Sequence, residues 1–456
     1  MPAIVTDRFK KELLLMLEAD IVDSANNFYV GIGRSYDWSA SDDASTPLST
    51  ERDQRNSQLD LVSVKNVEAH SFVIPRYTWT LGAIYQAYND GAVGHPSNSY
   101  YVITDENNVY VCLQQGKNAQ GQSVTSSVKP SGTLTTSFGT ADGYIWKFLY
   151  SVGALRASRF LASNFMPVTK YLGFDSDDAA DQVEQVGIQN AAVKGEIVGF
   201  EVTAGGTGYT TSPVVTVYGN GTGAKGSASI SGGAITKIEL VDSDGNYALG
   251  RNYTYASATI SGGNGTGGKI RPILGPSLGF GADPRDDLRA TAMMFTAKPD
   301  GDEGGDWLVG NDFRQVSLIK NPLKGQDADS DFTGNTGNAL RRLEFATVSS
   351  NFTVDKVILG STSQTEAYVS KVDSDTVWFI QNETTGFKPF TEGEAITETD
   401  GNGSGVLESV GTDGDTDAYA EGEIRRRSGE VVYIDNRAAV SRSADQKEDI
   451  KIIIQL

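Results

Sequence analysis

The spacing of apolar residues predicts one helix close to the start of the chain. In residues 7–21 the apolar side chains recur at steps of three and four, at Phe9, Leu13, Met16, Leu17 and Ile21. Thr6 is well placed to cap the helix, because its hydroxyl can accept from a free N–H of the first turn. Since an apolar stripe is normally buried, we expect this face of the helix to pack into the core.

After this helix, alternating and β-branched runs predict strands. The runs lie at residues 27–35, 61–69, 71–79, 100–114, 142–152, 311–323, 429–440 and 449–456. Asn107 and Asn108 divide one run into a hairpin, because asparagine tolerates the positive φ of a tight turn. Pro75 interrupts another run and cannot donate a ladder hydrogen bond, so we expect that strand at the edge of a sheet.

Two stretches have a different texture, and each contains an internal duplication. The repeats pair residues 196–209 with 234–247, the pentapeptide GNGTG of 219–223 with that of 263–267, and residues 352–372 with 390–410. A duplicated unit of strand, glycine turn and strand buries its apolar face against its own copy. We therefore expect two small inserted β modules.

The strands outside the duplications share the same alternating, β-branched pattern. They therefore predict a single body that the two inserted modules interrupt. The expected fold class is mainly β: a layered β-sandwich body with long loops and an N-terminal helix, interrupted by two small duplicated β modules. The expected segments are the first part of the body at 1–190, a module at 191–282, the second part of the body at 283–344, a module at 345–417, and C-terminal strands that complete the body at 418–456.

Composition excludes several classes of protein. The 456 residues carry a net charge of −20, which argues against a general nucleic-acid binder. No stretch approaches the roughly 20 consecutive apolar residues of a membrane span, and the N-terminus is not a secretory signal. The single cysteine, Cys112, cannot form an internal disulfide, which favours synthesis in a reducing cytoplasm. With two histidines, a three-histidine zinc site is impossible within one chain.

Two glycine-rich motifs resemble nucleotide sites. Residues 221–226 satisfy G-x-G-x-x-G, but the sequence that follows predicts strands and turns where a dinucleotide site needs a helix. Residues 263–270 nearly match a phosphate-binding loop, but Ile270 stands where a Ser or Thr hydroxyl must bind magnesium. Glycine turns of a repeat explain both motifs better, so we expect no nucleotide cofactor.

Acidic clusters and possible nucleophiles give no firm site. Alternating aspartates could bind calcium, but they lack the glycine and terminal glutamate of an EF-hand loop, and we expect solvated loops. The clusters lie at Asp175, Asp177, Asp178 and Asp181, at Asp327, Asp329 and Asp331, and at Asp413, Asp415 and Asp417. Cys112 is expected to be a small core residue. Among 58 acids a glycosidase-like pair cannot be denied, but nothing marks one, so we expect no catalytic or metal residue and no enzyme.

Several short sequence motifs lie outside the modules, and the most specific of them are in the C-terminal half of the chain. Their residues are Arg34, Trp38, Pro75, Arg76, Trp79, Trp146, Phe313, Arg314, Gln315, Asn321, Pro322, Gly429, Glu430, Tyr433, Asn436, Arg437, Asp445 and Gln446. In these motifs the chain resembles the peripheral, dimeric baseplate wedge protein of T-even-type contractile-tailed bacteriophages. The family tends to carry prolines after its Asn-Arg pair, whereas Ala438 and Ala439 stand here.

The resemblance implies a structural virion protein of the tail baseplate, assembled in the host cytoplasm. It implies a homodimer that joins other wedge proteins, with structural rather than catalytic motif residues and no nucleic-acid partner. The role of the modules is not part of the resemblance. An alternative is a receptor- or glycan-binding tail protein that uses the modules. Its candidate rings are Tyr209, Tyr247, Tyr253, Tyr255 and Trp378, although we expect these rings to pack between the repeat copies instead.

Overall fold

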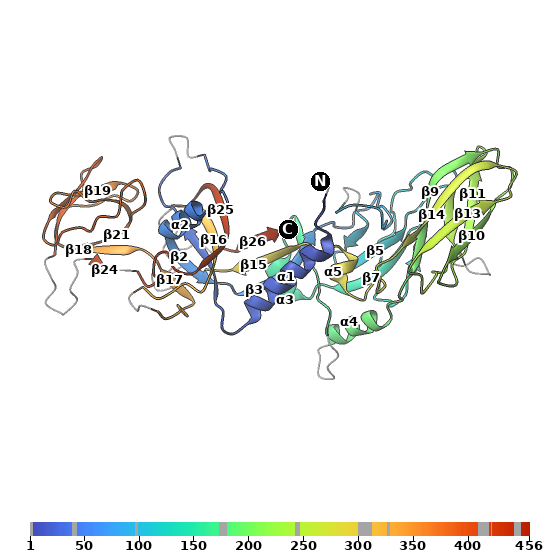
Figure 1. Cartoon of the computed structure of the whole chain (residues 1–456), viewed down its shortest axis with the longest axis horizontal. Helices are drawn as coiled ribbons and strands as arrows, with labels where there is room; N and C mark the ends of the chain where they lie inside the picture. Colours follow the sequence, from blue (N-terminus) through green and yellow to red (C-terminus); the bar gives the residue numbers. More distant parts are fainter. Residues whose placement is uncertain are drawn as a thin grey trace. The chain divides into compact units, whose positions relative to one another are not determined.

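The protein is mainly β, in agreement with the expected fold class (Figure 1). The computed structural model describes residues 3–38, 43–95, 99–172, 180–241, 247–299, 312–325, 329–408, 419–420, 422–441 and 448–456. Contacts divide the chain into two compact units, each built from separate segments. The first unit contains Met1–Leu14, Ser71–Met294 and Gln455–Leu456, and the second contains Leu15–His70 and Phe295–Ile454.

In the first unit, short sheets surround an aromatic core and lead into the first duplicated module. Helix α1 (Asp7–Val22) and strands β3 (Ala69–Pro75), β15 (Ala292–Ala297) and β26 (Ile450–Gln455) cross the division between the units. The other elements are β4 (Tyr101–Ile103), β5 (Asn108–Gln114), β6 (Phe138–Gly139), β7 (Ile145–Ser151), α3 (Ala154–Phe160), β8 (Phe165–Pro167), α4 (Ala180–Asn190), β9 (Ile197–Thr207), β10 (Val214–Gly219), β11 (Gly226–Ser231), β12 (Ala234–Leu240), β13 (Ala256–Ser261), β14 (Thr266–Leu274) and α5 (Pro284–Asp287).

The second unit contains a five-stranded antiparallel sheet and the second duplicated module. The sheet has the order β17-β2-β1-β16-β25, so β25 lies at its edge. The elements of this unit are β1 (Phe28–Gly33), α2 (Glu51–Leu59), β2 (Leu61–Asn66), β16 (Asp312–Lys320), β17 (Thr336–Asn338), β18 (Arg341–Ser350), β19 (Val357–Gly360), β20 (Glu366–Asp373), β21 (Thr376–Ile380), β22 (Ala395–Glu398), β23 (Ser404–Leu407), β24 (Tyr419–Ala420) and β25 (Glu430–Ser441).

Helix α1 forms where the sequence predicts it, but a different face is buried. Leu14 is 1% exposed and Lys11 is buried, whereas Phe9 and Met16 are 54% and 69% exposed. The Lys11 ammonium contacts Asp286 and lies 4.0 Å from a carboxylate oxygen of Asp283. The prediction that the apolar stripe is buried is therefore wrong, because the ion pairs with Asp283 and Asp286 draw the Lys11 face inward.

The predicted hairpin at residues 100–114 is confirmed as β4 and β5, and Asn107 has the expected positive φ of 61°. The expectation that Pro75 marks an edge strand is wrong. Strand β3 lies between β15 and β8 in the sheet β26-β15-β3-β8. Pro75 is tolerated there because it is the last residue of the strand, opposite Phe165.

The first duplicated module consists of the four-stranded sheet β12-β11-β10-β13 and the pair β14-β9. Each copy supplies a tyrosine that packs on the glycine turn of the other copy. A Cβ atom at Gly265 would meet the ring of Tyr209, and one at Gly221 would meet the ring of Tyr253. Both the tyrosines and the glycines are 44 residues apart. The repeated GNGTG turns therefore serve packing between copies.

The second duplicated module is a closed antiparallel barrel of six strands. The order β21-β20-β19-β22-β23-β18 closes through a further pairing of β18 with β21, and β24 adds to β18. The repeat explains the arrangement, since β19 and β22 are equivalent strands and pair with each other. Buried Phe345, Phe352, Phe379 and Phe390 fill the interior. The residue boundaries of the five predicted segments stay predictions.

Two buried glutamates of the barrel fix its turns. Glu394 accepts hydrogen bonds from the backbone N–H groups of Thr362, Ser363 and Thr391, at 2.8, 2.8 and 2.6 Å. Burial alone would raise the pKa of Glu394, but these donors and the Ser363 hydroxyl lower it. Glu398 accepts from the N–H groups of Thr353 and Gly403. Each carboxylate thus joins one copy of the repeat to the other.

Candidate functional site

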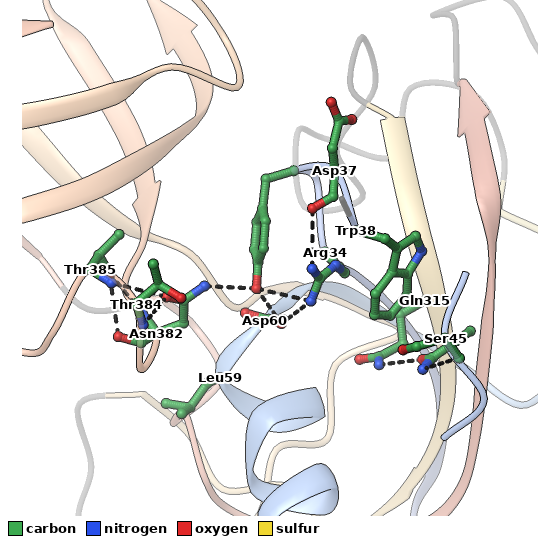
Figure 2. A network of polar contacts seen from close by, with 12 residues as sticks. Arg34, Asp37, Trp38, Ser45, Leu59, Asp60, Gln315, Asn382, Thr384 and Thr385 are labelled. Carbon is green, nitrogen blue, oxygen red and sulfur yellow. Dashed lines mark hydrogen bonds and ion pairs between the residues drawn. The ribbon is translucent and has the colours of Figure 1, made fainter. Parts of the chain in front are cut away.

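Six of the motif residues that carry the family resemblance meet at one polar network in the second unit: Arg34, Trp38, Arg314, Gln315, Asn436 and Arg437. Figure 2 shows this network, which we call the Arg34 junction. It connects the loop after β1 with the end of α2, with strands β16 and β25, and with the barrel. Its members are Arg34, Ser35, Tyr36, Asp37, Trp38, Asp60, Arg314, Gln315, Tyr368, Ser370, Asn382, Asn436 and Arg437.

Arg34 occupies the centre of the junction. Its φ is +55°, its backbone N–H donates to the carbonyl of Asp60 at 2.8 Å, and its own carbonyl accepts from Arg314. The guanidinium carbon lies 3.8 Å from the ring centroid of Trp38 and 4.3 Å from that of Tyr36. A planar cation between two rings gains cation–π and stacking energy that a lysine ammonium cannot match.

A chain of hydrogen bonds leads from α2 to the barrel. The hydroxyl of Tyr36 donates to Oδ2 of Asp60 at 2.7 Å and accepts from Nδ2 of Asn382 at 2.7 Å. Oδ1 of Asn382 accepts from the backbone N–H groups of Thr384 and Thr385, which fixes the amide. The ring of Tyr36 stacks on Tyr368 of the barrel with 4.4 Å between centroids. The barrel is therefore held to the loop after β1 by both polar and aromatic contacts.

A second set of contacts joins the same loop to β16 and β25. Arg314 is buried and donates to the carbonyl of Ser35 and, at 2.6 Å, to the carboxylate of Asp37. Nε1 of Trp38 donates to the carbonyl of Arg437 at 2.9 Å. Nε2 of Gln315 donates to Oδ1 of Asn436 at 2.7 Å, and Nδ2 of Asn436 donates to the carbonyl of Ser45. These bonds fasten the loop across the edge strand β25.

Burial and the charges around it set the ionisation of this region. Burial raises the pKa of Asp60, although the hydroxyl of Tyr36 and the charges of Arg34 and Arg426 oppose the rise. Burial likewise raises the pKa of Tyr36, and the negative charge of Asp60 adds to the rise. At the barrel side, burial raises the pKa of Asp355 to about 6, with Asp312 and Asp37 adding to the shift and Arg314 opposing it.

Other motif residues of the second unit form a turn contact beside the junction. Gly429 has a φ of +75°, and a Cβ atom there would meet the carbonyl of Lys320 and the nitrogen of Pro322. Asn321 accepts from the N–H of Asn27 at 2.6 Å. Glu430 pairs with Lys320 in the register of β16 and β25. Phe313 is buried, and Tyr433 pairs with Leu318 in the same register.

In the first unit, two of the remaining motif residues, Trp79 and Trp146, meet in the aromatic core. Trp146 is fully buried and stacks on Tyr144 with 5.7 Å between centroids. Nε1 of Trp79 donates to the hydroxyl of Ser126 at 3.1 Å, and that hydroxyl donates to Asp142. Arg76, next to Pro75, donates to the carbonyl of Ala162 at 3.1 Å.

Several candidates from the sequence lie elsewhere or outside the described residues. Tyr209 and Tyr253 are 5% and 6% exposed and pack under glycine turns, which confirms the expected packing between repeat copies and removes both rings as candidates for ligand contact. Tyr255 is 66% exposed. Cys112 is a buried core residue, as predicted. Asp445 and Gln446 fall outside the described residues, as do Asp175, Asp177, Asp178, Asp327, Asp413, Asp415 and Asp417.

Sequence reasoning missed the partners that complete the Arg34 junction. Tyr36 stands between the motif residues Arg34 and Trp38, so its position in the sequence could have marked it as a candidate. Asp60 follows a helix that the sequence analysis does not predict. Tyr368 and Asn382 belong to the barrel, which the family resemblance does not cover, and no local signal points to them.

The side chains of the junction are engaged mainly with one another. Arg34, Asp60 and Asn382 point toward one another, and most of their polar atoms are already bonded within the protein (Figure 2). In the described part of the chain no group of three or more His, Cys, Asp or Glu residues is placed to hold a metal ion. Among the described helices, none is long and apolar enough to cross a membrane. Neither a scan of protein-family models nor a search of curated proteins gives a match to this sequence.

Proposed function

We propose that this chain is a structural protein of a contractile phage tail, a wedge subunit of the baseplate. In this role it links neighbouring wedge proteins during assembly and infection, acts as a homodimer, and makes or breaks no covalent bond. The proposal places it in the virion, after assembly in the host cytoplasm. It rests first on the resemblance of the motif residues to that family.

One observation carries the proposal in the structure. Six motif residues of the second unit meet at the Arg34 junction, where Arg34, Trp38 and Arg314 connect a loop to two strands and to the barrel. Such a set of contacts fixes the geometry of several segments at once. A subunit that transmits force between partners needs segments that hold their positions, which supports a mechanical role.

The surface of α1 supports a protein that packs against others. Phe9, Leu13 and Met16 are 54%, 40% and 69% exposed, and they follow one another along one side of the helix. Apolar side chains that gather on a surface mark sites of protein contact more often than single exposed ones do.

The test is the presence of the chain in tails and its state of association. Mass spectrometry of purified virus tails should find the chain in a stoichiometry equal to that of other wedge proteins. Sedimentation velocity of the full chain at micromolar concentration should show a dimer. Absence from purified tails would overturn the wedge assignment, and a purely monomeric boundary would overturn the dimer.

A further inference from the structure

The first unit contains a cleft of about 880 Å³ between the first duplicated module and the neighbouring body. Strands β9 and β12 form one side, and the end of β5 with residues 84–92 forms the other. Volumes of about 300–1,000 Å³ are typical of ligand sites. We call it the module cleft. Nothing in the proposed wedge function accounts for it.

The walls of the module cleft are held together, so its shape is formed before any ligand arrives. Arg271 of β14 donates to the side chain of Asn89 at 2.8 Å and to Asp90 at 2.5 Å. The hydroxyl of Thr236 on β12 donates to the carbonyl of Ala119 at 3.4 Å. A preformed site spends less binding free energy on ordering.

Three glutamines, Gln86, Gln114 and Gln115, line the cleft. Within the described residues their side-chain amides make no hydrogen bond. Each amide offers two N–H donors and a carbonyl acceptor. Because these amides are at least partly open to solvent, a ligand that carries both donors and acceptors can replace their water with paired hydrogen bonds.

The charges of the lining are balanced, which disfavours an ionic ligand. The lining contains two lysines, Lys117 and Lys237, and two glutamates, Glu201 and Glu239. Lys237 pairs with Glu239 at 2.9 Å, and Glu201 pairs at 2.9 Å with Arg271, which lies outside the lining. Apolar surface lies beside the amides, from Phe200 and from Ile84, which is 38% exposed. A neutral ligand with one apolar face and many hydroxyl groups matches this lining.

We propose that the module cleft binds a neutral oligosaccharide. The amides of Gln86, Gln114 and Gln115 would bond sugar hydroxyls, and Ile84 would contact the apolar face of a sugar ring. The inference does not rest on the wedge function, and its test involves no tail assembly. A short neutral peptide, which also offers donors and acceptors, is the competing occupant that the experiment distinguishes.

The experiment applies the full chain to an array of neutral oligosaccharides, both hexose polymers and N-acetylhexosamine polymers. Binding to at least one of them is expected, and Gln115→Ala should weaken it about tenfold, the effect of losing a hydrogen-bonding amide. Gln120→Ala, at an exposed glutamine outside the lining, is the matched control and should bind as the wild type does. Equal binding by both variants would place the sugar elsewhere and overturn the proposal.

A second variant tests whether oligosaccharide binding can be lost while the protein stays folded. Ser123 lines the cleft and is exposed, so Ser123→Trp should fill the cleft without disturbing the core. Its thermal melt, followed by circular dichroism, should match the wild type while oligosaccharide binding is lost. An array with no bound oligosaccharide contradicts the proposal, and so does binding of neutral hexapeptides in place of sugars.

Discussion

At the scale of the residue, Arg34 holds together contacts that no other side chain could combine. Its guanidinium faces two rings, and Nη1 lies 3.7 Å from the carboxylate of Asp60. Its side chain is 17% exposed, so water weakens these interactions less than it would at the surface. The contribution of Arg34 therefore depends on the planar shape of the cation as well as on its charge.

Replacing Arg34 by lysine should show this dependence. Arg34→Lys keeps the charge but loses the stacked geometry, so the free energy of unfolding should fall by about 1–2 kcal/mol. Urea unfolding followed by circular dichroism measures the change. Arg52→Lys is the matched control, because Arg52 pairs with Glu383 with 69% of its side chain exposed. That variant should stay within about 0.5 kcal/mol of the wild type, and equal losses in both would contradict the argument.

Asp355 makes a second prediction at this scale. Partial desolvation by the surrounding protein raises its pKa to about 6 although the residue is partly exposed, so the folded state holds the proton more tightly than the unfolded state does. The resulting stability is present at low pH and is lost as the pH rises from about 4 through about 6. Arg314 opposes this loss, whereas Asp312 and Asp37 add to it.

The variant Asp355→Asn cannot ionise and should escape that loss. The free energy of unfolding of the variant relative to the wild type should rise between about pH 4 and 6.5 and stay constant above it. Urea unfolding at a series of pH values measures the difference. Asp400→Asn, at a side chain that is 95% exposed, is the control. A difference for Asp355→Asn that does not vary with pH would show that burial does not control its ionisation.

At the scale of the element, the first duplicated module depends on the contact between tyrosine and glycine turn. A Cβ atom at Gly265 would collide with the ring of Tyr209, which is itself buried. Gly265→Ala should therefore lower the free energy of unfolding by more than about 2 kcal/mol. Thermal unfolding of the full chain measures this effect.

Gly187 of α4 gives the opposite expectation and serves as the control. No atom lies within 4 Å of a Cβ atom built there, and the position is an exposed site in a helix. Gly187→Ala should stabilise the protein by up to about 1 kcal/mol, because alanine favours a helix more than glycine does. If both alanine variants shift stability in the same direction, the packing of tyrosine on the glycine turn is not what fixes the repeat.

The elements that the sequence predicted were those with a local signal. Alternating β-branched and aromatic residues marked β1 and β5, and a three- and four-residue period marked α1. Helix α2 was missed because ERDQRNSQL carries no apolar stripe. Its start is fixed instead by the Thr50 hydroxyl, which accepts from the N–H of Asp53 at 3.1 Å. Which face of α1 is buried depended on Asp283 and Asp286, which lie far away in the sequence.

The candidate site was predictable only in part, for the same reason. Motif comparison singled out Arg34, Trp38 and Arg314, but not the residues that bind them. Asp60 and Asn382 are 322 positions apart, and they reach the same tyrosine only because the barrel folds next to the end of α2. The pairing of β18 with β21, which closes the barrel, likewise depends on tertiary structure and cannot be predicted from a local sequence pattern.

At the scale of the whole molecule, each of the two units has its own interior. Trp146 lies in a core cluster of the first unit and Phe379 in one of the second. Domains with separate cores often unfold separately, so a single two-state transition is not the expectation here. Calorimetry of the full chain should give a transition enthalpy larger than the van't Hoff enthalpy of the same data.

Variants in each unit should identify the transitions. Gly265→Ala weakens the first unit, so it should lower the temperature of one transition and leave the other in place. Glu394→Gln weakens the barrel in the second unit, because the amide NH2 replaces one carboxylate oxygen and then faces N–H donors, either those of Thr362 and Ser363 or that of Thr391. It should lower the other transition, whereas Glu392→Gln, at an exposed side chain, should lower neither. If Gly265→Ala and Glu394→Gln shift the same transition equally, the two units unfold as one cooperative body.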